Sequence, residues 1–195
     1  IYEVFEKPLI KILAFMEIEG VEIDNKFLRS LSSKFEKKIL KLEKEVFKIS
    51  KKEFNIASPK QLGEIIYNDL KIAGLKKTKK GSFATSASVL EDLAFKGHEF
   101  PKLILDWRQV SKLKNTYSDA LPEHINPNSK RVHTSFLLAA TTTGRLASSD
   151  PNLQNIPIKS EDGKDIRKAF TAKKGYLLIS ADYNQIEMRI LADLA

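Results

Sequence analysis

Residues 26–53 read KFLRSLSSKFEKKILKLEKEVFKISKKE, and this stretch decides the fold of the chain. Apolar residues return every three or four positions along it, which is the period of an amphipathic α-helix with a narrow apolar seam. Lysines and glutamates occupy most of the other positions. A long helix with an apolar seam needs a partner helix that presents a facing seam. The seam consists of Leu28, Leu31, Phe35, Ile39, Leu42, Val46 and Ile49.

Residues 102–121 supply such a partner, because their apolar residues repeat at the same spacing. Two long helices with facing seams pack together well when they run antiparallel. The sequence therefore predicts a projecting helical hairpin, and we read its apolar stripes as packing without any chemistry. The second stripe consists of Leu103, Trp107, Val110, Leu113, Tyr117 and Leu121.

The far end of the hairpin is predicted to be a helical tip. Ser58 is suited to cap a helix that begins with Pro59 and runs to about residue 70. Residues 76–86 (KKTKKGSFATS) form a basic, hydroxyl-rich loop that leads into a second short helix. Helix N-termini beside such a loop suit phosphate groups. The alternative interpretation of the loop is a solvated linker.

Three further signals mark helix ends. Ser88 and Glu91 are spaced as a capping box at the start of the second tip helix, expected over about 88–96. The apolar spacing of residues 1–19 predicts another helix, and Gly20 stands where it would end. A short extended connection follows, after which Asp24 or Asn25 is suited to cap the long helix.

The pattern changes after residues 121–127 (LPEHINP), where two prolines end the hairpin. Polar and apolar residues alternate over 131–138, which predicts a strand, and 166–172 and 176–181 are further strand candidates. The run 176–181 is too apolar to face water. The whole chain is therefore predicted to be mainly α with a small antiparallel β part, an α+β fold.

Two segments of the last third are rich in groups that can carry chemistry. Residues 141–157 (TTTGRLASSDPNLQNIP) are a polar loop suited to a hydrogen-bonding partner. In residues 176–189 (YLLISADYNQIEMR), an apolar run delivers Asp182, and the amphipathic pattern that follows carries Glu187. This order places a carboxylate at the edge of a sheet, where it can bind a cation that prefers oxygen ligands.

Charge and composition narrow the possible partners. The 195 residues have a net charge of +8, and residues 20–122 hold 21 lysines and arginines against 13 acidic residues. A polyanion is the natural partner for such a segment, although lysine-rich helices can also serve solubility alone. There is no cysteine, so disulfides and thiolate chemistry are excluded, and no apolar run approaches a membrane span of about 18 residues. The chain lacks an initiating Met and stops in mid-pattern, so we expect it to be a piece of a longer protein.

Several segments, in this order, resemble the family A DNA polymerases. The last of them resembles the family's motif A, although Asn184 and Met188 stand where Ser and Leu are usual. Because matching segments occur throughout, the resemblance covers nearly the whole chain. The segments are 55–62 (NIASPKQL), 112–117 (KLKNTY), 143–146 (TGRL), 150–157 (DPNLQNIP), 166–170 (IRKAF) and 182–189 (DYNQIEMR).

The resemblance implies a division into three parts. Residues 1–19 would be the C-terminal end of a preceding exonuclease-like domain. Residues 20–122 would be the thumb, and residues 123–195 the first part of the palm, including motif A. The fold would then be a long antiparallel helical hairpin with a helical tip, followed by an incomplete antiparallel palm sheet.

The resemblance also implies contacts with duplex DNA. A polymerase must hold any sequence, so its contacts should go to phosphates and to minor-groove acceptors that every base pair presents. Ser58, Lys77, Thr85 and Ser86 would contact phosphates at the tip, and Arg108 and Lys112 would do so near the base of the hairpin. Arg145 would lie in the minor groove near the primer terminus, with Gln154, Asn155 and Lys159 against the strands. A structural ion pair is the alternative role for Arg145.

For catalysis, the resemblance implies that Asp182 and the backbone carbonyl of Tyr183 bind Mg²⁺ in a two-metal site. Glu187 would exclude a 2′-hydroxyl from the incoming sugar, so the catalytic set is Asp182, Glu187 and Arg145. Two alternatives remain from the residues themselves. One is a sequence-nonspecific duplex DNA-binding module without chemistry, and the other is a metal-dependent nuclease that uses Asp182 and Glu187.

The implied activity is template-directed DNA synthesis by a longer polymerase. The helix that binds the triphosphate and the later palm motif with the second metal-binding Asp have no counterpart in these 195 residues, which are therefore predicted to be inactive alone. The implied partners are primer–template duplex DNA and deoxynucleoside triphosphates. We also expect a monomer without membrane contact, located in the bacterial cytoplasm with the nucleoid.

Overall fold

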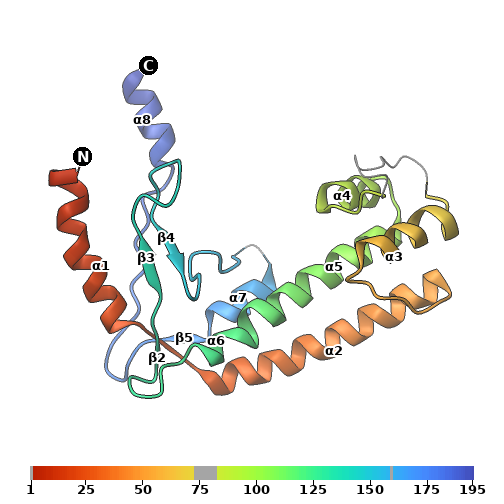
Figure 1. Cartoon of the computed structure of the whole chain (residues 1–195), viewed down its shortest axis with the longest axis horizontal. Coiled ribbons are helices and arrows are strands. Elements are labelled where there is room, and N and C mark those ends of the chain that lie inside the picture. Colours follow the sequence, from red (N-terminus) through yellow and green to blue (C-terminus); the bar gives the residue numbers. More distant parts are fainter. Residues whose placement is uncertain (1, 73–82, 159) are drawn as a thin grey trace.

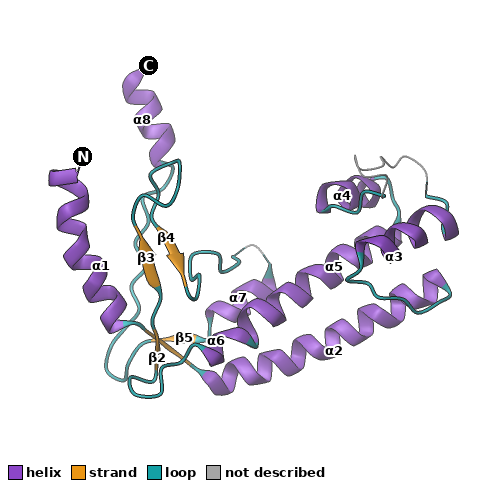
Figure 2. Cartoon of the chain, in the orientation of Figure 1, coloured by secondary structure: helices purple, strands orange, loops and turns teal. Residues whose placement is uncertain are grey.

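The computed structural model describes residues 2–72, 83–158 and 160–195. Lys77 and Lys159, and the rest of the basic loop up to residue 82, lie outside the described residues. The predicted fold class is confirmed, because helices dominate and the strands are few and short (Figure 2). The strands are β1 (Val21–Ile23), β2 (Arg131–Val132), β3 (Ser135–Leu137), β4 (Ala147–Ser149) and β5 (Phe170–Thr171).

Helices occur along the whole chain, from α1 near the N-terminus to α8 near the C-terminus (Figure 1). The α-helices are α1 (Lys7–Glu19), α2 (Asn25–Ser50), α3 (Pro59–Glu64), α4 (Ala87–Phe95), α5 (Glu99–Leu113), α6 (Ala120–Glu123), α7 (Glu161–Arg167) and α8 (Ile186–Leu194). Three single turns of wider, π-helical geometry are η1 (Tyr2–Glu6), η2 (Ile65–Asp69) and η3 (Lys114–Ser118). Since η3 and α6 continue α5, the second hairpin helix has nearly the predicted length.

The predicted hairpin is confirmed, because α2 and α5 lie side by side and project away from the strands (Figure 1). At about 1.5 Å per residue, the 26 residues of α2 span roughly 39 Å. Asp24 caps α2 as predicted, since its carboxylate accepts a hydrogen bond from the Phe27 amide at 2.9 Å. The apolar seam faces the partner helix, and Phe35 and Val46 are fully buried in it.

The apolar interior is divided into two clusters, one at each end of the hairpin. The base cluster and the tip cluster are joined by Leu103 and Trp107, which pack against both. Trp107 also donates a hydrogen bond from Nε1 to Glu43 at 3.1 Å, which ties α5 to α2 between the two clusters. The buried residues of the base cluster are Ile23, Leu28, Leu31, Phe35, Leu42, Val110, Leu113, Tyr117, Leu121, Val132, Ile166 and Ala169. Those of the tip cluster are Val46, Ile56, Leu62, Ile65, Ile66, Leu90, Leu93, Phe100 and Ile104.

The tip agrees with one predicted cap and corrects the other. Ser58 caps α3, and its hydroxyl accepts a hydrogen bond from the Gln61 amide at 3.4 Å. The capping box of Ser88 and Glu91 is wrong, because α4 begins two residues earlier than that box requires. Ser86 is the N-cap, with extended backbone angles, and its hydroxyl lies 3.2 Å from the Ser88 hydroxyl.

Two small antiparallel sheets stand at the base of the hairpin. One has the order β2–β1–β5, with Val21 opposite Val132 and Ile23 opposite Phe170. The other pairs β3 with β4. The residues predicted to be only an extended connection therefore form the central strand of a sheet.

The strand predicted over 131–138 is present, but it is divided between the two sheets. The break lies at His133 and Thr134, whose side chains bond to other segments. His133 Nδ1 lies 2.7 Å from the carbonyl oxygen of Glu17 in α1, and Thr134 bonds to the segment around Ser148. These contacts turn the chain between β2 and β3.

The strand predicted over 166–172 is mostly wrong, because α7 occupies its first part and only Phe170–Thr171 is a strand. Ser160 caps α7 by accepting a hydrogen bond from the Gly163 amide at 3.1 Å. Two acidic residues in the first turn and two basic residues in the last turn complement the helix dipole. These local signals favour a helix over the predicted strand.

The strand predicted over 176–181 is also wrong, since no strand is formed there. Its apolar side chains are highly exposed, and Leu177 and Ile179 are 88% and 91% exposed. A strand exists only through pairing with a neighbour, and none of the described strands pairs with this segment. The expectation that it is too apolar to face water is wrong for the described residues.

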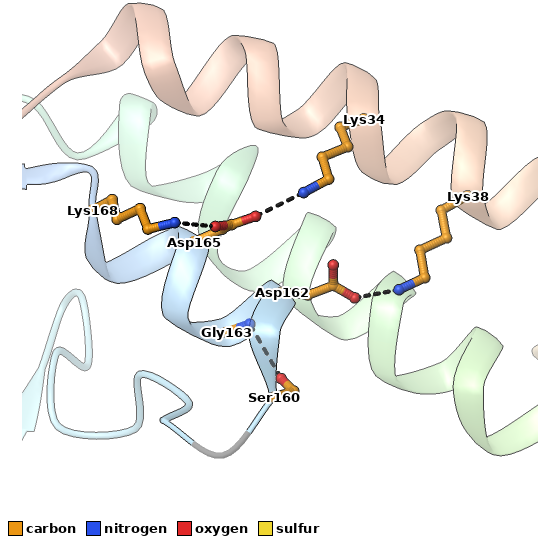
Figure 3. A network of polar contacts seen from close by, with 7 residues as sticks. All are labelled: Lys34, Lys38, Ser160, Asp162, Gly163, Asp165 and Lys168. Atoms are coloured by element: carbon orange, nitrogen blue, oxygen red, sulfur yellow. Dashed lines mark hydrogen bonds and ion pairs between the residues drawn. The ribbon is translucent and has the colours of Figure 1, made fainter.

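Ion pairs join α7 to the long helix α2 (Figure 3). Lys34 Nζ lies 2.7 Å from Asp165 Oδ2, and Lys38 Nζ lies 2.5 Å from Asp162 Oδ2. Asp165 also accepts from Lys168, and the hydrogen bonds from Lys168 and Lys34 hold the pKa of Asp165 below its ordinary value. Since the lysines are about half exposed, each pair contributes at most about 1 kcal/mol to stability. Together the pairs fix where α7 lies on the hairpin.

Gly20 ends α1 as predicted and allows a close approach to β2. Its φ of 62° lies in the left-handed region, and its amide bonds back to the Met16 carbonyl. A Cβ atom at this position would lie 2.6 Å from the Val132 carbonyl oxygen, so a larger residue would displace the strand.

Among the residues that the structure describes, no helix has the length and apolar character needed to cross a membrane.

Candidate nucleic-acid interface and metal site

Two of the predicted phosphate-binding residues of the tip, Thr85 and Ser86, lie at the start of α4. Arg108 of α5 donates a hydrogen bond from Nη1 to the Thr85 carbonyl at 2.6 Å, directly before the N-cap Ser86. Partial burial lowers the pKa of Arg108 from its usual value, although a guanidinium remains charged at neutral pH. Arg108, predicted near the base of the hairpin, therefore lies beside residues predicted for the tip.

These residues differ in how accessible they are. Ser86 is exposed, but Thr85 is only 7% exposed, so Thr85 contributes its carbonyl to Arg108 more readily than its hydroxyl to a ligand. Lys112 is exposed on α5, and it shares a face with Arg108 because the two are four residues apart. Ser58 caps the neighbouring helix α3 and is partly exposed. This arrangement offers cations, a hydroxyl and two helix N-termini to an anionic partner.

Arg145 and Glu187, two of the predicted catalytic residues, are brought together although 42 positions separate them. Arg145 Nη2 lies 3.2 Å from Glu187 Oε1, and both side chains are more than 70% exposed. The ion pair that was the alternative role for Arg145 therefore exists in this structure. An exposed pair of this kind is weak, so each partner can exchange it for a ligand at little cost.

The polar loop after β4 presents two predicted DNA contacts. Gln154 and Asn155 lie in a turn with exposed side chains, whereas Leu153 and Ile156 on either side pack against the base cluster. The Gln154 amide donates to the Asn152 side chain at 2.9 Å. The turn therefore exposes two amide side chains to solvent, while the apolar residues on either side of them are packed against the base cluster.

The predicted metal ligands lie just before α8. Asp182 and Tyr183 are exposed, and the helix that follows carries Glu187 in its first turn. The Asp182 carboxylate is a hard oxygen donor open to solvent, which fits one ligand of a Mg²⁺ ion. Within the described ranges, no three His, Cys, Asp or Glu side chains are grouped so that they could hold a metal. The residues present thus fit part of a metal site.

Sequence reasoning missed the residues that support the polar loop. Tyr117 donates a hydrogen bond to the Asn155 carbonyl, and Thr134 and Ser148 hold the preceding segment. Tyr117 was assigned to the apolar seam, and its ring does pack there. A hydroxyl on a buried side chain signals that a hydrogen-bond partner is required, but the sequence does not identify that partner.

Comparisons with known proteins found a matching family model and several similar proteins. Residues 25–195 match the family model described as "DNA polymerase family A". A protein named "DNA polymerase I" from Rhizobium leguminosarum is 52% identical over all 195 residues, which correspond to 19% of that relative. One of the same name from Caldicellulosiruptor bescii is 51% identical over the whole chain and 23% of its own length.

A solved structure is similar in its fold as well as in its sequence. It is described as the POL domain of Pol1 from M. smegmatis in complex with DNA primer-template and dNTP. The TM-score is 0.85 at 39% identity, over 96% of this chain and 33% of the other. The chain thus spans about a fifth of the length of the curated relatives that it matches. From the family match over most of its length, we conclude that the chain belongs to DNA polymerase family A.

Proposed function

We propose that these residues form the thumb and the first part of the palm of a longer enzyme that synthesises DNA on a template. The supporting observation is the likeness to about a third of a polymerase domain that was solved with DNA primer-template and dNTP. Residues 1–19 end the preceding exonuclease-like domain, 20–122 form the thumb and 123–195 begin the palm. The projecting hairpin of α2 and α5 supports the assignment of the thumb.

The boundary at residue 20 has one structural consequence. β1 belongs to the proposed thumb, yet it pairs with β2 and β5 of the proposed palm. The thumb therefore begins inside the palm's sheet, and α2 leaves directly from that sheet after a single capping residue. Such a short connection fixes the direction in which the hairpin projects.

The proposed role of the thumb is to hold duplex DNA without regard to sequence. Ser58, Ser86, Arg108 and Lys112 bind phosphates, and Thr85 assists through the carbonyl that holds Arg108. Lys77 and Lys159 lie outside the described residues, and we propose that Lys77 binds phosphate and that Lys159 contacts the DNA strands. Arg145, Gln154 and Asn155 contact the minor groove, where amide and guanidinium donors meet acceptors that every base pair offers.

The proposed role of the palm segment is catalytic. Asp182 and the Tyr183 carbonyl would hold Mg²⁺, and a pair of such ions would supply activation of the primer 3′-hydroxyl and neutralisation of charge on the phosphoryl group. Glu187 packs beside the sugar of the incoming deoxynucleoside triphosphate and excludes a 2′-hydroxyl. Arg145 leaves its ion pair with Glu187 and contacts the DNA near the primer terminus instead.

For the 195 residues in isolation, a duplex DNA-binding module without chemistry is a second proposal. It is favoured by the single predicted metal carboxylate. A nuclease using Asp182 and Glu187 is disfavoured because, among the residues that the structure describes, no third acidic side chain is grouped with these two. We further propose that the complete protein acts as a monomer in the bacterial cytoplasm, associated with the nucleoid.

The basic loop at the tip is expected to set the salt dependence of DNA binding. Each phosphate that a cation neutralises adds about 0.9 to the slope of log affinity against log salt concentration. Fluorescence anisotropy with duplexes of unrelated sequence should show similar affinities and a steep slope. Replacing the loop lysines should flatten that slope. The substitutions are Lys76→Ala, Lys77→Ala, Lys79→Ala and Lys80→Ala.

A matched control removes four lysines outside the proposed thumb, and its slope is expected to stay closer to that of the wild type. An unchanged slope in the loop variant would return the loop to the solvated-linker interpretation. The control substitutions are Lys7→Ala, Lys11→Ala, Lys173→Ala and Lys174→Ala.

The isolated chain is expected to show no primer extension with Mg²⁺ and all four deoxynucleoside triphosphates. The reason is that one metal carboxylate does not build a two-metal site. Gel-resolved extension of a labelled primer measures this, with the template omitted as one control and a complete family A polymerase as the other. Templated extension by rigorously purified chain would contradict the proposal that activity needs the longer protein.

A further inference from the structure

The turn that presents Gln154 and Asn155 is built on an in–out–out–in pattern. Leu153 and Ile156 pack against the base cluster, while the two amide side chains between them are exposed. Amide side chains that contact DNA bind more tightly when the backbone beneath them is already in place, because less conformational freedom is lost on binding. The contacts that hold this backbone therefore decide how well the turn can serve DNA.

The middle of the turn is held by a buried hydroxyl from the hairpin. Tyr117 lies in η3, directly after α5, and is only 2% exposed. Its ring packs in the base cluster and its hydroxyl donates a hydrogen bond to the Asn155 carbonyl. Burial raises the pKa of Tyr117, so the hydroxyl stays protonated and remains a donor at neutral pH.

The start of the turn is held by two further hydroxyl groups. Thr134 Oγ1 lies 2.8 Å from the Pro151 carbonyl oxygen and 2.6 Å from Ser148 Oγ. Ser148 Oγ in turn accepts a hydrogen bond from the Leu153 amide at 3.1 Å. Both side chains are less than 10% exposed, so water does not compete freely for these bonds.

The end of the turn is held by α7. Gly163 approaches Pro157 so closely that a Cβ atom at Gly163 would lie 2.7 Å from the Pro157 Cβ. The helix itself is fixed to α2 by the ion pairs of Lys34 and Lys38 (Figure 3). Both ends of the turn are thus attached to the scaffold, and Tyr117 supports the carbonyl between them.

We propose that Tyr117 is a positioning residue, which holds Gln154 and Asn155 in place for DNA by bonding the Asn155 carbonyl. This inference rests on the proposed function, in which these two side chains contact the minor groove. The same helical segment carries Arg108 and Lys112, which are proposed to bind phosphates. Tyr117 therefore sets the distance between the phosphate contacts and the minor-groove contacts from a single rigid element.

The positioning itself can be tested without DNA. Tyr117→Phe removes one oxygen atom and keeps the ring in the base cluster. Hydrogen exchange of the 195-residue chain should then show the amides of residues 152–156 exchanging about fivefold faster, as expected for the loss of one hydrogen bond. Amides in the middle of α5 should keep their wild-type rates, which also shows that the variant is folded. Unchanged exchange in the turn would overturn the proposal.

The role toward DNA is tested with a double-mutant cycle on duplex affinity. We expect Tyr117→Phe to weaken binding about threefold to tenfold in the wild-type chain, which corresponds to about one hydrogen bond. The same change should have almost no effect when Gln154→Ala and Asn155→Ala are already present, because the side chains that it positions are gone. A purely structural role would weaken both backgrounds equally, and that result would overturn the proposal.

Two controls separate the possible failures. Tyr176→Phe removes a hydroxyl from a 70% exposed side chain, and neither exchange in the turn nor affinity should change. If Gln154→Ala with Asn155→Ala binds DNA as tightly as the wild type, the proposed minor-groove contact is wrong and the role of Tyr117 toward DNA falls with it. If amide exchange in the turn is nevertheless faster in Tyr117→Phe, the support of the turn by Tyr117 stands and only the proposed DNA contact is wrong.

Discussion

Asp182→Asn in the complete polymerase is expected to slow single-turnover nucleotide incorporation by about a thousandfold, because metal ligation supplies several kcal/mol of transition-state stabilisation. The neutral amide has nearly the same shape as the carboxylate but is a weaker ligand for Mg²⁺. Duplex DNA affinity should change by less than about twofold, since the residue lies away from the proposed phosphate contacts at the tip. Rapid-quench incorporation and anisotropy titration measure the two quantities separately.

Asp193→Asn is a suitable control, because it makes the same change of charge on α8, eleven residues further along the chain. It should leave incorporation within a few fold of the wild type. A parallel loss of DNA affinity in Asp182→Asn would mean that Asp182 supports the fold of the segment before α8. The proposed metal ligand would then be wrong.

Glu187→Ala is expected to raise the ribonucleotide-to-deoxyribonucleotide ratio of kcat/KM at least about tenfold. A side chain that excludes a hydroxyl by its bulk does so through a clash, and shortening it opens space beside the sugar. The ribonucleotide value should therefore rise. The deoxyribonucleotide value should fall to a smaller extent, because the Arg145 partner is also lost. Matched ribonucleotide and deoxyribonucleotide substrates in single-turnover reactions measure both values.

Glu187→Gln distinguishes shape from charge in the same assay. It keeps the size of the side chain and removes the charge that pairs with Arg145 at 3.2 Å. If bulk excludes the hydroxyl, this variant keeps the wild-type ratio while Glu187→Ala does not. A wild-type ratio in both variants, with both rates reduced, would show that Glu187 is a catalytic or structural acid and that the proposed sugar selection is wrong.

The helical part of the fold could be predicted because its signals are local. The seam of α2 repeats within one segment, and the caps Asp24 and Ser58 each act on amides two or three residues away. The facing seam of α5 required one further assumption, that the two stripes pack against each other, and Val46 and Val110 of the predicted stripes are buried as expected. Period and capping were therefore sufficient for this half of the molecule.

The strands and the supports of the polar loop depend on partners far away in the sequence. β1 was read as a connection because its pairing residues are more than a hundred positions away. Residues 166–172 were a strand candidate, whereas the Ser160 cap and the charges of α7 favour a helix. Arg145 and Glu187 were each predicted as site residues, but no pattern in either segment indicates that they meet.

The interior of the hairpin is divided into a base cluster and a tip cluster, so its two ends bury largely separate apolar surfaces. Leu103 and Trp107 touch both clusters and so couple them. Because each cluster buries its own apolar surface, opening the outer one exposes less of that surface than complete unfolding and requires less free energy. The outer part can therefore lose and regain its order while the inner part, with the sheets and Tyr117, stays intact. If the hairpin holds duplex DNA as proposed, its outer end can adapt to an irregular duplex while its inner end keeps its contacts.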